Sequence, residues 1–180
     1  MMIWARLLVM IAATLTFADF PSVAHGPTPQ KVEEKIAIAA PPQIVWDAVK
    51  DFDALTSWNP LVESSAGSGG NEANGTREVV LKSGGKLIDS LDEYSGEDMS
   101  YSYRLAEPNI EAFPVSFYSA TLTVRPGENG GSEVEWSGRF YRADTGNFPS
   151  EAQNDQAAID AMTKFFKEGL ESLKQKIETP

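Results

Sequence analysis

The C-terminal segment 156–177 carries one continuous apolar stripe with helical spacing. The stripe consists of Ile159, Met162, Phe166, Leu170, Leu173 and Ile177, and Phe165 widens it. A helix of about six turns with a single apolar face needs an equally long apolar surface to lie on. This requirement constrains the fold, because only a sheet built from the preceding residues offers such a surface.

The residues before this helix predict that sheet. From Leu61 onward, apolar and polar residues alternate in runs that end at glycine-containing turns. We expect strands at 31–40, 61–66, 76–82, 86–94, 99–107, 117–125 and 132–142. Short links between successive strands require antiparallel neighbours. The predicted fold is therefore α+β, with a seven-stranded antiparallel sheet and a long C-terminal helix.

Two short helices are expected between the first two strands. The proline pair 41–42 stands where a helix can begin, and the apolar residues from Ile44 to Phe52 follow helical spacing. We expect these residues to close the core, with Trp46 at its margin. A second short helix is expected at 55–58, because Pro60 disfavours helical backbone at the residue before it.

Residues 1–24 have the layout of a secretory signal peptide, with a positive charge at Arg6, an apolar run and small residues before His25. The apolar run is shorter than the roughly 20 residues that span a bilayer. We therefore expect cleavage after Ala24 and export to the periplasm, with a retained membrane anchor as the alternative. Residues 25–30 then form a linker, and residues 31–178 form one domain.

The composition restricts both partners and chemistry. The formal net charge of -11 repels nucleic-acid phosphates and anionic membrane surfaces, so neither nucleic-acid binding nor stable membrane insertion after cleavage is expected. A basic protein partner is favoured, although the charge could serve solubility alone. The chain has no cysteine and His25 is its only histidine, which excludes Ser-His-Asp and Cys-His catalysis. We predict no metal site and no cofactor.

Strand alternation places unusual residues on the inner face of the sheet. Tyr103 and Trp136 point inward, as does Asp89, which shares its face with Leu91. A carboxylate in a dry core is costly unless it is paired, so an inward Asp89 predicts a wet or ligand-filled cavity. The alternative is a bulge that places Asp89 at the solvent end of its strand. Gly138 marks either a bend or room for something against the backbone.

Several segments resemble the polyketide cyclase/dehydrase branch of the START-like superfamily, whose members have the helix-grip fold. They include IAIAAPPQIVWDAVKDFDALTSWNP, SEVEWSGRFYRA and the terminal FFKEGLESLKQ, and the resemblance covers nearly all of residues 31–177. The resemblance implies a curved sheet around the long helix, with an apolar cavity between them. Together with the leader, the chain also resembles the periplasmic accessory proteins of the methanol-oxidation clusters of methylotrophic bacteria.

The resemblance also implies which residues line the cavity. Asp89, Tyr118, Ala120 and Gly138 fall where plant hormone receptors of this fold contact their ligands. The full predicted pocket consists of Trp58, Asp89, Leu91, Tyr103, Tyr118, Ala120, Trp136, Gly138, Phe140, Met162, Phe165 and Phe166. The family acid is here an aspartate and Ala120 lacks a hydroxyl, so the ligand contacts of the relatives do not transfer directly. Trp58 is expected at the pocket mouth, as a gate.

Three functions remain open at this point. The favoured one, implied by the resemblance, is a non-catalytic periplasmic accessory protein that contacts methanol dehydrogenase or its cytochrome c, and the acidic chain would suit a basic partner of this kind. The second is a carrier or sensor of a small hydrophobic ligand. The third is a cyclase or dehydrase that would use Asp89 and Glu93, both of which alternation places on the inner face, with inward tyrosines as proton donors. No catalytic residue is predicted, since no nucleophile or cofactor motif accompanies these carboxylates.

Overall fold

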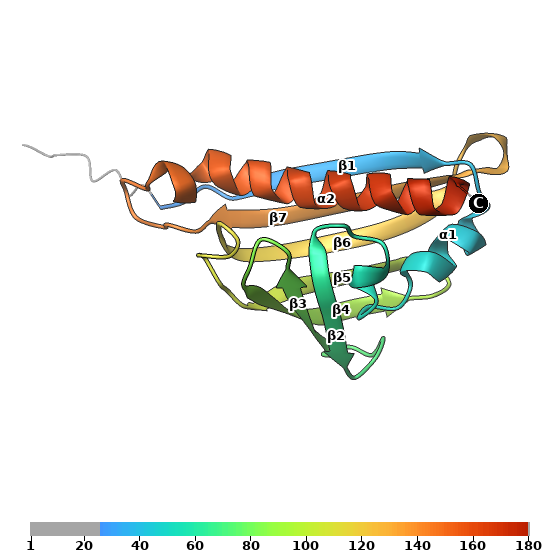
Figure 1. Ribbon diagram of the computed structural model, residues 1–180, viewed down its shortest axis with the longest axis horizontal. Helices are drawn as coiled ribbons and strands as arrows, with labels where there is room; N and C mark the ends of the chain where they lie inside the picture. The colour runs from blue at the N-terminus through green and yellow to red at the C-terminus, as the bar shows by residue number, and fades with distance from the viewer. Residues whose placement is uncertain (1–25, 180) are drawn as a thin grey trace, which may run out of the picture.

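The computed structural model describes residues 26–179, which form one antiparallel sheet, one long helix and several short helical turns. The strands are β1 (Gln30–Ile38), β2 (Val62–Ser68), β3 (Thr76–Leu81), β4 (Lys86–Ser95), β5 (Ser100–Glu107), β6 (Val115–Pro126) and β7 (Ser132–Arg142). They lie in the order β1-β7-β6-β5-β4-β3-β2, and the sheet curves around α2 (Figure 1). The predicted seven-stranded α+β helix-grip fold is confirmed.

The helix α2 (Asp155–Glu178) lies along the inner face of the sheet, against β1 and β7 (Figure 1). It begins at Asn154, whose side-chain oxygen accepts a hydrogen bond from the backbone N–H of Ala157 at 2.9 Å. Such a cap satisfies one of the donors that the first helical turn leaves free. Its buried face contains Ala158, Met162, Phe165, Phe166, Gly169, Leu170 and Leu173. The apolar stripe predicted from the sequence therefore contacts the sheet.

The helix α1 (Pro42–Val49) and the short helix η1 (Leu55–Ser57) connect the two edge strands. Proline stands in the first turn of α1, where no intrahelical donor is needed. The buried side of α1 consists of Val45, Trp46 and Val49. Two expectations about this helix were wrong. Ile44 is 55 % exposed instead of closing the core, and Trp46 is only 3 % exposed instead of lying at the margin.

A bulge in β4 turns Glu93 away from the interior. The pairing of β4 with β5 shifts register between Leu91 and Glu93, so strict alternation fails beyond Leu91. Glu93 is exposed as a result, and Tyr94 turns toward α1, where its ring lies 5.6 Å from that of Trp46. The prediction that Glu93 faces the interior was wrong, because period-two reasoning cannot locate a bulge.

The described residues begin after the leader predicted at 1–24, so that segment and His25 lie outside the described part of the chain. Gln30, which was assigned to the linker, already belongs to β1. Among residues 26–179, no helix is both long enough and apolar enough to cross a membrane.

Candidate functional site

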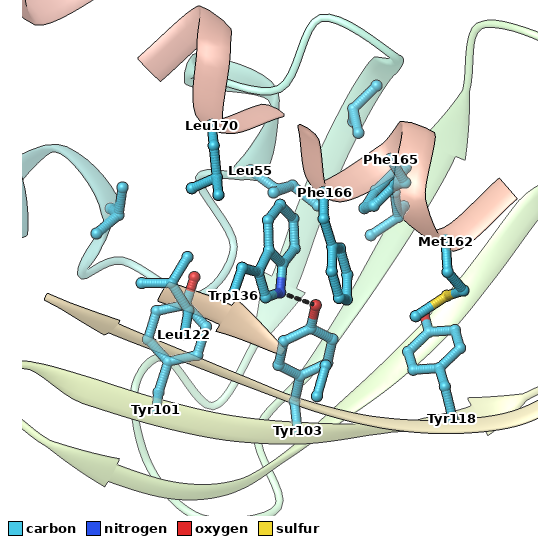
Figure 2. Close-up of a cluster of buried hydrophobic side chains, with 14 of the residues drawn as sticks. Leu55, Tyr101, Tyr103, Tyr118, Leu122, Trp136, Met162, Phe165, Phe166 and Leu170 are labelled. Carbon is cyan, nitrogen blue, oxygen red and sulfur yellow. Dashed lines mark hydrogen bonds between the residues drawn. The ribbon is translucent and has the colours of Figure 1, made fainter. Parts of the chain in front are cut away.

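The layer between the sheet and α2 contains every residue that the sequence assigned to a ligand pocket. Gly138 is buried, and each of the other members is at most 8 % exposed. Figure 2 shows how Tyr103, Tyr118 and Trp136 rise from neighbouring strands toward Met162 and Phe166 on the helix. The structure therefore brings the predicted residues together in one place.

Aromatic side chains fill this layer. The indole of Trp136 stacks on the ring of Phe166, with centroids 4.3 Å apart and an angle of 16° between the planes. The rings of Trp58 and Phe165 also contact Trp136, at centroid distances of 5.2 Å and 5.7 Å. Trp136 donates a hydrogen bond from Nε1 to the Tyr103 hydroxyl at 3.0 Å (Figure 2). A ligand that entered this layer would have to displace side chains that already pack against one another.

Asp89 faces the interior, where it is paired with an arginine. The Nε of Arg77, on the adjacent strand β3, donates to an Asp89 carboxylate oxygen at 2.9 Å, and both residues are 1 % exposed. The Tyr118 hydroxyl donates a hydrogen bond to the other oxygen of the carboxylate. The sequence-based interpretation missed Arg77, and with it the reason why a buried carboxylate is tolerated here. The inward Asp89 therefore requires no wet cavity.

The guanidinium of Arg77 lies between two aromatic rings. Its Cζ atom is 4.2 Å from the ring centroid of Phe52 and 4.5 Å from that of Tyr103. Its Nη1 donates to the backbone carbonyl of Phe52 at 2.9 Å. Cation–π contacts and hydrogen bonds replace much of the hydration that a buried guanidinium loses. One signal in the sequence was available, since Arg77 alternates with Val79 and Leu81 on the inner face of its strand.

The ionisation of these groups follows from their burial. Burial raises the pKa of Asp89, while the Arg77 charge and the Tyr118 hydroxyl oppose the rise. Burial lowers the pKa of Arg77, but the Asp89 charge and neighbouring tyrosines raise it by more, so the guanidinium stays charged. Burial raises the pKa of Tyr118 well above its ordinary value and that of Tyr101 to about 12. These groups form an internal network that is almost wholly shielded from solvent.

Gly138 makes room for the helix. A Cβ atom at this position would lie 3.0 Å from Cζ of Phe166 and 3.1 Å from Cε of Met162. Of the two interpretations left open by the sequence, close approach is the one observed, and the approaching group is the chain's own helix. Gly169 has the matching role on α2, because a Cβ there would lie 2.8 Å from the side-chain nitrogen of Asn59.

Trp58 is not a gate. It is 2 % exposed and packs behind Trp136, and its Nε1 is buried without a hydrogen-bond partner. Its neighbour Asn59, which the sequence-based interpretation did not single out, attaches this turn to the helix. The Asn59 amide donates to the Phe165 carbonyl at 3.2 Å, and its oxygen accepts from the Leu61 N–H at 3.0 Å. The prediction for Trp58 was wrong because this bond draws the turn inward.

An apolar cleft of about 200 Å³ opens at the edge of the filled layer. It lies between α2, the β3–β4 turn and the β5–β6 loop, and its apolar walls include Leu61, Leu81, Ala112, Phe113, Ala161 and Phe165. The two loops touch: the Asn109 amide donates to the Lys86 carbonyl at 3.3 Å, and Gly85, at φ +81, lies directly against Ala112. Phe113 and Phe165 line this cleft, and each is 8 % exposed.

The surface around α1 and the β4–β5 hairpin is acidic. Tyr94 joins the two elements, and burial together with the nearby charge of Asp51 raises its pKa. The exposed carboxylates of this region, here called the acidic end, are Asp47, Asp51, Glu93, Glu97 and Asp98. Lys50 pairs with Asp47 at 2.8 Å, so a negative excess remains. No group of three histidine, cysteine or carboxylate side chains that could hold a metal ion occurs among residues 26–179.

Comparison with known proteins identifies relatives along the whole domain. Residues 29–178 match the model of a family described as polyketide cyclase / dehydrase and lipid transport. None of the curated proteins matches the chain. The structure of XoxI from Bacillus cereus is 26 % identical and has a TM-score of 0.71, covering 83 % of this chain and 96 % of XoxI. An uncharacterised protein from Bacillus thuringiensis is also 26 % identical, with a TM-score of 0.69 and coverages of 82 % and 98 %.

A more distant structure shares the fold alone. It is a point mutant of norcoclaurine synthase from Thalictrum flavum in complex with a transition-state analogue. It is 12 % identical to this chain, with a TM-score of 0.62, and the alignment covers 84 % of this chain and 95 % of the synthase.

Proposed function

The chain belongs to the polyketide cyclase/dehydrase and lipid transport family, and we propose that it is a non-catalytic accessory protein of the periplasm that supports methanol oxidation. It would do so by contacting methanol dehydrogenase or its cytochrome. The likeness to XoxI agrees with the resemblance to the accessory proteins of methanol-oxidation clusters. The periplasmic location is proposed from the leader at 1–24, and the mass of the exported protein tests it, because cleavage after Ala24 leaves His25 as the N-terminus.

The acidic end is the observation that carries this proposal. Its carboxylates come from two elements that meet where the rings of Trp46 and Tyr94 pack together, so they lie on one surface. Complementary charge accelerates the encounter of protein partners and orients them, particularly at low ionic strength. A basic face on the dehydrogenase or on the cytochrome is therefore the expected counterpart.

The interior argues against a catalytic role. Asp89 is the buried carboxylate that a cyclase or dehydrase would use, and Arg77 and Tyr118 occupy both of its oxygens. A general base must come within hydrogen-bond reach of the proton it removes. Asp89 can reach no substrate unless this network opens, so an accessory role fits the geometry better than acid–base catalysis.

Electron transfer from the dehydrogenase to its cytochrome tests the accessory function. Adding the purified protein should increase the rate of cytochrome reduction, and the increase should shrink as salt is added. The variant Asp51→Asn/Glu93→Gln/Glu97→Gln removes three charges from the acidic end and should lose about half or more of the stimulation.

A matched control removes the same charge from the exposed side of α2. Asp160→Asn/Glu168→Gln/Glu171→Gln should keep the stimulation, because these side chains lie on the helix face away from the sheet. Equal loss in both variants would mean that only net charge matters. If the protein neither alters electron transfer nor binds the dehydrogenase or the cytochrome in a pull-down, the accessory proposal is wrong.

A second function is favoured by the cleft at Phe113 and Phe165, namely binding of a small hydrophobic ligand. Ligand sites are concave and mostly apolar, with few polar groups, and the cleft has this character. Native mass spectrometry of the protein taken directly from a periplasmic extract should show a bound small molecule. Only unliganded protein, with no thermal shift from a panel of hydrophobic compounds, would exclude this function.

A further inference from the structure

We infer that the cleft beside Phe113 and Phe165 takes a small amphiphilic monocarboxylate, with its apolar end on these rings and its carboxylate at Lys82 and Lys164. The inference rests on the second function above and specifies the chemical class of its ligand. It is independent of the acidic end and of any protein partner.

The size of the cleft limits the apolar part of the ligand. Its volume of about 200 Å³ is below the range of roughly 300–1,000 Å³ that is usual for ligand pockets. At about 30 Å³ for each water-sized unit, it accommodates a chain or ring of roughly seven heavy atoms. The layer behind it is closed by the packing of Phe165 against Trp136, so a longer chain would have to extend into solvent.

The charge of the lining selects the polar end. Lys82 and Lys164 are the charged residues that line the cleft, and no carboxylate lines it. This distribution runs against the composition of the chain, in which 26 acidic residues outnumber 15 basic ones. Lys82 is exposed and takes part in no ion pair among the described residues. Lys164 is 3.9 Å from Glu168 with 64 % of its side chain exposed, a contact too long and too solvated to hold it.

The two lysines come from different sides of the cleft. Lys82 follows β3 at the β3–β4 turn, and Lys164 stands on α2, one residue before the buried Phe165. Both carry long flexible stems that can follow the apolar wall while the ammonium groups stay in water. A carboxylate attached to an apolar body in the cleft can therefore meet both ammonium groups, whereas an amine in the same position would be repelled.

Hexanoate, 1-hexanol and hexylamine test the inference, because they share one apolar chain and differ in charge. Binding to the purified protein is followed by two-dimensional NMR of the backbone amides. Hexanoate should shift the amide signals of Ser83, Ala112 and Phe165, with a dissociation constant in the millimolar range that is expected of so few atoms. It should bind about fivefold more tightly than 1-hexanol at low salt, since each exposed ion pair adds a small factor. That advantage should vanish in 1 M salt.

Two variants separate the charge from the apolar cleft. Lys82→Gln/Lys164→Gln should abolish the preference for hexanoate and leave the affinity for 1-hexanol unchanged, while the control Lys167→Gln, on the same helix but outside the cleft, should keep the preference. Ala161→Phe should fill the cleft and abolish binding of all three compounds.

The possible negative results of these binding experiments have different consequences for the inference and for the second function. Equal binding of hexanoate and 1-hexanol, or tighter binding of hexylamine, would overturn the assignment of a carboxylate and leave hydrophobic ligand binding standing. If none of the compounds shifts the cleft amides, both this inference and the second function are wrong. Shifts spread over the whole surface with no saturation would count as the same result.

Discussion

Replacing Asp89 by asparagine removes the counter-charge of Arg77 with almost no change in side-chain volume. The guanidinium would remain charged and buried, and its partners would be the Phe52 carbonyl, two aromatic rings and at most a neutral amide oxygen. Breaking a buried ion pair on one side costs about 3–5 kcal/mol, because one uncompensated charge stays in the core. Asp89→Asn should therefore lower the free energy of unfolding by about that amount, a large part of the 5–15 kcal/mol that is typical of a domain.

Replacing the other member of this ion pair gives a second test. Arg77→Met leaves the Asp89 carboxyl buried without its cation, so its pKa should rise further. A carboxyl whose pKa is higher in the folded than in the unfolded chain stabilises the folded state at pH values below its unfolded pKa. This contribution is lost as the pH rises through the pKa that the carboxyl has in the folded state. Arg77→Met should thus be more destabilising at pH 8 than at pH 5. In Arg77→Met/Asp89→Asn neither charge remains. The free energy of unfolding should therefore fall by much less in this double variant than the sum of the decreases in the two single variants.

Urea unfolding followed by tryptophan fluorescence measures these differences, because Trp46, Trp58 and Trp136 are all buried. The control is Lys86→Gln, which breaks an exposed pair of 2.7 Å with Glu78 on the same two strands and should cost less than about 1 kcal/mol. If the losses of the two single variants are simply additive, or if Asp89→Asn is as mild as the control, the described pairing is not what keeps this carboxylate in the core.

Three further predictions concern the filled interior. Trp58→Ala should lower the free energy of unfolding by about 3–5 kcal/mol in urea titrations, since it opens a cavity beside Trp136. A loss below about 1 kcal/mol would contradict the buried packing and support a gate role for Trp58. Gly138→Val should cost about 1–3 kcal/mol by crowding Phe166, also measured in urea, and a neutral effect would mean that α2 can move away. Burial raises the pKa of Tyr101 to about 12, so this residue alone should lower the stability by about 1.4 kcal/mol per pH unit between pH 10 and pH 12, and the raised pKa of Tyr118 adds to the fall; an unchanged slope in the variant Tyr101→Phe would contradict this.

Local patterns predicted the elements and the inner face well. The stripe of 156–177 is the buried side of α2, and the alternation around Trp136 identifies the inward residues of β7. Both succeed because helical and strand periodicity depend only on the chain's nearest neighbours. The same reasoning failed at Glu93, where one extra residue in β4 reverses the alternation.

Contacts between distant segments could not be predicted in this way. Alternation in its strand indicates that Arg77 points inward, but it does not identify Arg77 as the partner of Asp89, because the pair forms across two strands whose register the hairpin turn determines. Likewise, Asn59 meets the Phe165 carbonyl only after α2 has docked, 106 residues away in the chain. These contacts convert a predicted cavity into a filled core.

The sequence by itself determined the strands, the long helix, the direction in which most side chains point and the acidic character of the surface, because each depends on local periodicity or on composition. Only the tertiary structure decided that aromatic rings fill the layer under the helix, that Arg77 neutralises Asp89, and that the accessible apolar cleft lies at Phe113 and Phe165. The physical reason is that packing and charge pairing depend on which side chains meet across strands and between elements, and the register of the sheet together with the docking of α2 onto it decides this.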